Sequence, residues 1–173
     1  VLLLIPDRKA TLTAEAAGPR AAETVRQMAP DELAIHVMDR DAKFQLVDAR
    51  EATDFAKATL PGAVNVAPAT LFGKEARNTL AGASVTKVFF ARDQAASVRA
   101  AALAKLTGTE NVVALAGGYD GFMAAVVNGG PAPDESTRTF RLRAGPEIVA
   151  LIKQQSAPKV VKVVRRVQGG CGG

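Results

Sequence analysis

The sequence predicts an α/β protein in which helices flank a parallel β-sheet. Short apolar runs rich in β-branched and aromatic residues recur along the chain, and segments of helical character lie between them. Turns containing Pro or Gly separate the two kinds of segment. Strands that alternate with helices pair in parallel through right-handed crossovers. The 173 residues, of which 48% are hydrophobic, suffice for one domain with a short appendage.

The expected elements follow one another from Pro30 onward. The Pro-Asp start of PDELAIHVMD favours a helix at 30–39. Further helices are expected at 50–58, 95–106 and 117–128, and Gly108 is expected to stop the second of these. Strands are expected at FQLVDA (44–49), SVTKVFFA (84–91) and NVVALA (111–116), and LPGAVNVA (60–67) is interpreted as a turn followed by a short strand.

The chain divides into four segments on this interpretation. Residues 1–29 form a lead-in arm, whose VLLLI start is a signal or anchor remnant or simply a strand. Residues 30–132 form the α/β domain, which ends in the turn signal GGPAP. Residues 133–167 form a small β-α-β-like extension that must dock on the domain or on a partner, with strands at 137–143 and 159–167 around a helix at 145–155. Residues 168–173 form a terminal arm.

The net charge of +5 is unevenly distributed. From Asp134 onward the chain has eight basic and three acidic side chains, which account for the whole excess. One Tyr and no Trp leave no stacking platform for nucleic acid, so an acidic protein partner or a small anion is expected instead. No apolar run is long enough to span a membrane.

Two chemistry-bearing side chains occur only once, His36 and Cys171. A single cysteine excludes an internal disulfide and leaves a free thiol, a disulfide-linked dimer or a carrier thiol. One His and one Cys cannot make a metal site, so neither a metal nor another cofactor is expected. His36 is interpreted as a surface or capping residue.

Three motifs in order make residues 30–127 resemble a rhodanese homology domain. They are VDAREATDF (Val47–Phe55), LPGAVNVA (Leu60–Ala67) and LAGGYDGFMAA (Leu115–Ala125). The resemblance implies a rhodanese-like sheet and a catalytic cysteine that follows the central strand and opens an anion-binding loop. Asp48 and Arg50 of the first motif are expected to form a structural ion pair.

The loop ARDQAAS (91–97) departs from that family's pattern. Ala91 occupies the cysteine position and Arg92 fits the residue that follows it; Asp93 and Ala95 complete the loop. Gln94 replaces the usual Gly, Ala96 replaces the usual Arg, and Ser97 is retained. Because alanine cannot attack sulfur, the loop is expected to be inactive. The domain is then a binding scaffold, an engineered Cys→Ala variant, or a protein whose nucleophile lies elsewhere.

The chain ends in a glycine-flanked cysteine, formed by Gly169, Gly170, Cys171, Gly172 and Gly173. Glycine explores backbone conformations closed to other residues, so we expect a thiol that can reach into another protein. The ending resembles the arm of SoxY, the carrier subunit of the periplasmic thiosulfate-oxidising Sox system, whose arm cysteine carries sulfur intermediates. It also resembles, superficially, the Gly-Gly end of ubiquitin-like sulfur carriers.

The leading hypothesis is therefore a sulfur carrier that binds sulfane or thiosulfate-derived sulfur on Cys171, as a persulfide or S-thiosulfonate, and passes it to sulfur-metabolising enzymes. One alternative is a non-catalytic interaction module, in which Cys171 serves as a tether or joins two chains. Another is a sulfurtransferase that uses Cys171 in place of the missing loop cysteine. The Sox resemblance implies a periplasmic location, with a cytoplasmic one as the alternative.

Overall fold

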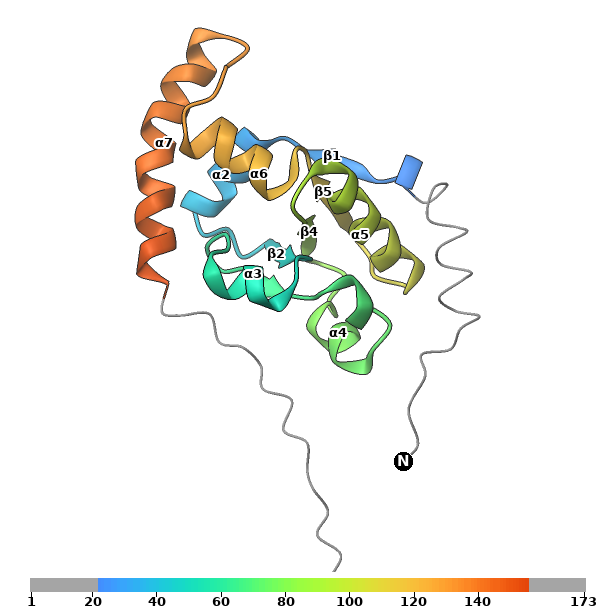
Figure 1. Ribbon diagram of the computed structural model, residues 1–173. Helices are drawn as coiled ribbons and strands as arrows, with labels where there is room; N and C mark the ends of the chain where they lie inside the picture. Colours follow the sequence, from blue (N-terminus) through green and yellow to red (C-terminus); the bar gives the residue numbers. More distant parts are fainter. Residues whose placement is uncertain (1–21, 156–173) are drawn as a thin grey trace, which may run out of the picture.

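The computed structural model describes residues 22–155 of the chain and contains one five-stranded parallel sheet (Figure 1). The strand order is β1-β5-β4-β2-β3, and β4 lies at the centre. The strands are β1 (Arg26–Met28), β2 (Phe44–Asp48), β3 (Val64–Asn65), β4 (Thr86–Phe90) and β5 (Val112–Leu115). This sheet confirms the predicted fold class.

Helices connect the strands and cover the sheet. They are α2 (Pro30–Met38), α3 (Ala52–Lys57), α4 (Lys74–Thr79), α5 (Gln94–Leu106), α6 (Gly118–Phe122) and α7 (Glu135–Gln154). A 3-10 turn, η1 (Pro68–Thr70), precedes α4, and a π-helical segment, η2 (Met123–Val127), follows α6 directly. The helices expected at 30–39, 50–58, 95–106 and 117–128 are all present, whereas η1 and α4 were not expected.

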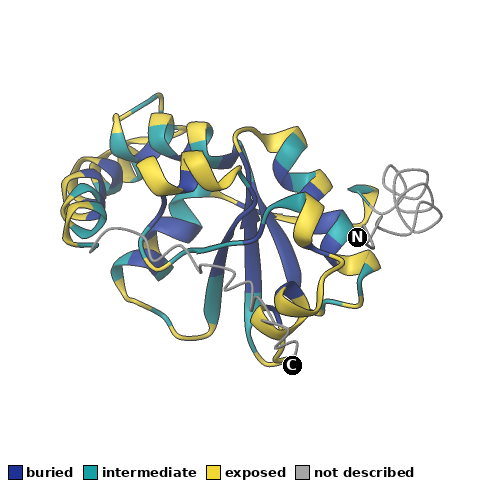
Figure 2. Cartoon of the chain, turned by 60° about the horizontal axis from the view of Figure 1, so that its bottom comes forward, coloured by how far each residue is buried: buried dark blue, intermediate teal, exposed yellow. Residues whose placement is uncertain are grey.

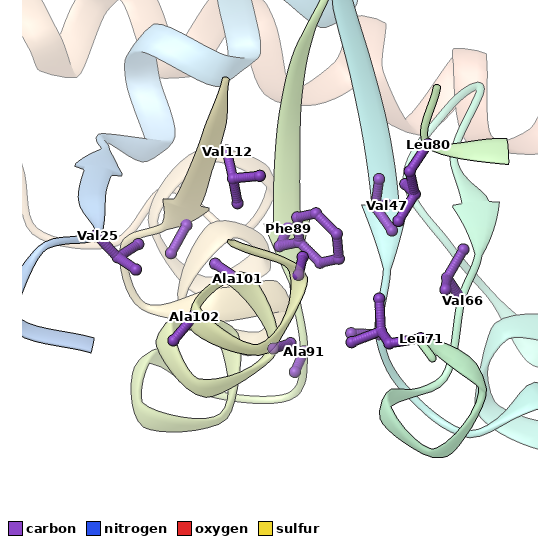
Figure 3. Close-up of a cluster of buried hydrophobic side chains, with 14 of the residues drawn as sticks. Val25, Val47, Val66, Leu71, Leu80, Phe89, Ala91, Ala101, Ala102 and Val112 are labelled. Atoms are coloured by element: carbon purple, nitrogen blue, oxygen red, sulfur yellow. The ribbon is translucent and has the colours of Figure 1, made fainter. Parts of the chain in front are cut away.

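Two hydrophobic clusters lie on opposite faces of the sheet, because successive strand side chains point to opposite sides. Val47, Phe89 and Ala114 belong to the cluster that α4 and α5 cover (Figure 3). Val88 and Val113 belong to the other, which α2, η2 and α7 cover. The central strands are accordingly buried between two helical layers (Figure 2). Such double burial is typical of parallel sheets and explains the continuous apolar runs.

Strand β1 was not expected, since residues 26–28 fell in the lead-in arm. It pairs in parallel with β5, with Arg26 opposite Val113 and Met28 opposite Leu115. Of its three residues only Met28 is buried. An edge strand that is polar at two of three positions has no alternating pattern long enough to detect.

The strand expected at 137–143 is wrong, because these residues lie within α7. Asp134 caps this helix by accepting a hydrogen bond of 2.7 Å from the Thr137 amide. Ala144 and Ile148 are fully buried against the domain. A Cβ on Gly145 would lie only 2.8 Å from the Val126 carbonyl oxygen, so glycine permits the close contact of α7 with η2. Helical packing thus overrides the local alternation of polar and apolar residues.

Helix α7 is also clamped by a buried arginine. Arg141 donates to both carboxylate oxygens of Asp31 on α2, at 2.7 and 2.8 Å, and to the Pro131 carbonyl at 2.6 Å. The hydrogen bonds and charge of Asp31 raise the pKa of Arg141 against the opposing effect of burial. The described part of the extension is therefore integrated with the domain. The strand expected at 159–167 and the arm at 168–173 lie outside the described residues.

No helix among residues 22–155 has the length and apolar character that a membrane span requires.

Candidate functional site

Three loops meet at the carboxyl ends of the central strands. Ala49 and Arg50 follow β2, residues 91–97 follow β4, and Ala116 and Gly117 follow β5. Backbone hydrogen bonds join them: the Ala49 amide donates to the Phe90 carbonyl, and the Tyr119 amide donates to the Ala91 carbonyl, both at 2.8 Å. Open parallel sheets place binding and catalytic groups at this edge.

Asp48, at the end of β2, is a fully buried carboxylate. The Arg50 guanidinium donates to it in a fork, from Nε to Oδ1 at 3.0 Å and from an Nη atom to Oδ2 at 2.7 Å. The Arg50 amide and the Thr59 hydroxyl add hydrogen bonds of 2.9 and 2.7 Å. Every carboxylate oxygen is thus satisfied, as a buried charge requires.

The same arginine connects this carboxylate to the segment after β5. Its guanidinium lies 3.8 Å from the centroid of the Tyr119 ring, a cation–π arrangement, and donates to the Ala58 carbonyl at 2.6 Å. Burial opposes the charge on Arg50, but the hydrogen bonds and charge of Asp48 outweigh it and raise its pKa. Burial also raises the pKa of Tyr119, which the charge of Arg50 partly offsets. Tyr119 stacks further on Phe90, at 6.3 Å between centroids.

The loop after β4 is held together by Ser97. Its hydroxyl accepts a hydrogen bond from the Ala91 amide at 2.8 Å and donates one to the Asp93 carbonyl at 2.7 Å. Ser97 is fully buried. The Ala91 side chain belongs to the cluster beneath α5 (Figure 3) and is 6% exposed. The turn is thereby closed from within, with a methyl group at its first position.

The side chains of Asp93 and Gln94 occupy two backbone amides at this edge of the sheet. Asp93 caps α5 by accepting from the Ala96 amide at 2.9 Å, and the Gln94 side-chain oxygen accepts from the Gly117 amide at 3.3 Å. Arg92 lies 3.5 Å from Asp120, an exposed pair. A carboxylate at the N-terminus of a helix complements the helix dipole. The same negative charge disfavours a second anion there.

Gly118 determines how closely the neighbouring segment approaches this loop. It has a φ of +64°, and a Cβ at this position would lie 2.6 Å from the Asp93 carbonyl carbon. Only glycine fits both constraints.

The loop itself offers little covalent chemistry. Ala91 has no nucleophilic atom, and the Ser97 hydroxyl is buried and already engaged with two backbone groups. Among residues 22–155, no three His, Cys, Asp or Glu side chains are grouped as metal ligands.

A family model described as the rhodanese-like domain matches residues 29–125, which is more than half of the chain. The chain belongs to the rhodanese-like family. Among curated proteins, none is similar enough in sequence to match.

Solved structures agree on the fold. A rhodanese-like domain from Anabaena has a TM-score of 0.52 and 20% identity over 61% of this chain and 76% of its own. A single-domain sulfurtransferase from Saccharomyces cerevisiae has a TM-score of 0.50 and 20% identity, over 59% of this chain and 91% of its own. A protein of unknown function from Rhodopseudomonas palustris, described as a possible tyrosine phosphatase, has a TM-score of 0.54 and 19% identity, over 68% of this chain and 92% of its own. At these identities the likeness establishes the rhodanese-like fold alone.

The structure brings together two of the sets singled out from the sequence, the Asp48–Arg50 pair and the loop 91–97. His36 lies elsewhere, near the amino end of β2, with its ring stacked on Phe44. Cys171 and its four glycines lie outside the described residues.

Sequence reasoning missed Thr59, Asn65 and Tyr119. Thr59 and Tyr119 contact the Asp48–Arg50 pair, while the Asn65 side chain donates to the Asp48 and Arg50 carbonyls, both at 2.9 Å. Asn65 and Tyr119 lie inside the quoted family motifs, and Thr59 immediately precedes one, so their position was the available signal.

Proposed function

We propose that this rhodanese-like protein is a sulfur carrier that binds sulfane sulfur covalently on Cys171 and delivers it to partner enzymes. Membership of the rhodanese-like family supports a general role in sulfur metabolism. The proposal that Cys171 carries the sulfur rests on Ala91, which places a buried methyl group at the position that the family resemblance assigns to the nucleophile. Cys171 is the one thiol the chain possesses.

The transfer step balances without an added oxidant when the donor is a persulfide. The Cys171 thiolate attacks the outer sulfur of the donor, a new sulfur–sulfur bond forms, and the donor's own bond breaks. The donor leaves as a thiolate, and Cys171 holds the persulfide. With thiosulfate, the same attack on the outer sulfur releases sulfite. A partner thiolate then takes the outer sulfur from Cys171 by the reverse chemistry.

The folded domain serves as the recognition body in this proposal. At the family site Ala91 supplies only a buried methyl group and the Gln94 side chain occupies the Gly117 amide, which supports a role in binding over one in catalysis. The basic residues before the arm suit an acidic enzyme surface or anionic sulfur species.

The test is the mass of the intact protein after incubation with glutathione persulfide and, separately, with thiosulfate. We expect the persulfide reaction to make the protein one sulfur atom heavier, and a thiol reductant to reverse the change. The matched control is Cys171→Ser, which should remain unmodified. Wild-type protein without an adduct under both conditions contradicts the proposal.

A second candidate is a non-catalytic interaction module, which the buried alanine at position 91 also favours. It predicts that Cys171→Ser binds partners as well as the wild type and supports the same cellular function. The sulfurtransferase alternative predicts thiocyanate formation from thiosulfate and cyanide that Cys171→Ser abolishes. The same pair of proteins therefore separates all three functions.

A further inference from the structure

A hollow of about 450 Å³ opens at the amino end of β2, beside the C-terminal end of α7. Its apolar lining includes Val37, Phe44, Leu46 and Leu151, and Gln154 and Gln155 form part of its wall. It is separate from the loop 91–97, because Phe44 begins β2 and Asp48 ends it.

The α2–β2 turn gives this hollow a preformed floor. The His36 ring stacks on Phe44 at 3.7 Å between centroids, and its Nδ1 lies 3.3 Å from an Asp41 carboxylate oxygen. The other Asp41 oxygen accepts from the Lys43 amide at 3.0 Å. Val37 and Leu46 are buried. The apolar surface is therefore fixed by the fold before anything binds.

The chain continues from the wall of the hollow. Gln155 is both a lining residue and the last described one, and 18 residues follow it. The run Lys159–Val164, KVVKVV, begins four residues later and contains four valines. Five residues from Gln155 to Val160 span up to about 17 Å, enough to bring the run to the hollow. Arg40 and Asp41 both line the hollow and balance in charge, so the match with this run is mainly apolar.

We propose that residues 159–164 of the same chain dock in this hollow, with valines against Phe44, Leu46 and Leu151. The functional role of this docking rests on the proposed carrier function of Cys171. Docking sets the length of the arm. Cys171 lies sixteen positions after Gln155, a reach of about 53 Å, but only seven positions after Val164, a reach of about 23 Å. The carrier thiol would then act within about 23 Å of the docked run.

The test compares the double variant Val161→Asp/Val164→Asp with Val167→Asp, which places the same charge just beyond the docking run. Hydrogen exchange is measured on the backbone amides of 41–46 and 151–155 in the full-length protein. We expect exchange in both segments to rise several-fold in the double variant and to stay at the wild-type level in Val167→Asp. Equal exchange in all three proteins overturns the proposal.

Two readouts separate the other outcomes. Protection that grows with protein concentration identifies a second copy as the occupant and contradicts docking within one chain. Intact mass after glutathione persulfide treatment tests Cys171 independently, since the double variant keeps the thiol. A loaded double variant with unchanged exchange overturns the docking alone, whereas normal docking without any adduct on the wild type overturns the carrier function.

Discussion

The segment after β2 and the loop after β4 lie at one edge of the sheet, yet they relate differently to the pattern that the sequence resemblance implies. The first keeps Asp48 and Arg50. The Arg50 guanidinium contacts the buried Asp48 carboxylate, a backbone carbonyl and an aromatic ring. The second keeps Ser97, which closes the turn, and differs at Ala91, Gln94 and Ala96. The retained Asp48, Arg50 and Ser97 each make hydrogen bonds to backbone groups. Ala91, in contrast, contributes only a methyl group to the core.

The largest effect is expected on removing the buried carboxylate. Asp48→Ala leaves Arg50 and Thr59 without their acceptor, so we expect a loss of about 3–5 kcal/mol in the free energy of unfolding. Urea unfolding followed by circular dichroism measures it. Asp120→Asn is the matched control, because its pair with Arg92 is exposed and contributes less than about 1 kcal/mol. Equal losses in both variants would show that Asp48 does not hold this edge together.

The next effect concerns the contact between the two segments beside the loop. Gly118→Ala forces a Cβ against the Asp93 backbone and keeps a positive φ, so we expect a loss of about 3 kcal/mol in unfolding free energy. Gly62→Ala is the control, since Gly62 has a φ of +75° with no atom within 4 Å of the added Cβ. It should cost about 1 kcal/mol through backbone strain alone. A Gly118 variant as stable as the Gly62 variant contradicts the close packing.

What the sequence could predict follows the same division. The core strands were recoverable because a strand buried on both faces is apolar at successive positions, as in VFF of β4. Asp48 and Arg50 were recoverable from their motif. Their contacts with Thr59 and Tyr119 were not, although the motifs point to both positions. Thr59 lies 11 positions from Asp48 and Tyr119 lies 69 from Arg50, so these pairs meet only in the folded chain.

Helix α7 shows a limit of a different kind. The alternation in TRTFRLR matched a strand, but the Asp134 cap, the Arg141–Asp31 clamp and the burial of Ile148 make it helical. Two of these three depend on residues of the domain, which a local pattern cannot contain.

A smaller loss is expected when the loop after β4 is opened. Ser97→Ala removes the acceptor of the Ala91 amide and the donor to the Asp93 carbonyl, both at a buried position. The expected loss is about 1–3 kcal/mol, with faster hydrogen exchange of the Ala91 amide. Ser84→Ala, at an exposed position, should change stability by less than about 0.5 kcal/mol. Unchanged exchange at Ala91 would mean that the hydroxyl does not close the turn.

The smallest expected effect concerns the ionisation of Tyr119, which is the one tyrosine of a chain without tryptophan. Burial raises its pKa, so the absorbance of tyrosinate should appear at higher pH in the folded protein than in urea, where the ordinary value of 10.0 applies. The sign for stability follows from the raised value: this contribution is fully present below pH 10.0 and is lost as pH rises through the folded pKa. Arg50 acts in the opposite direction, and its charge over the ring keeps the shift smaller than burial alone would produce. A folded protein whose tyrosine ionises at or below the value in urea would mean that the charge of Arg50 outweighs burial, and that the ring is held at this edge more by the cation than by the core.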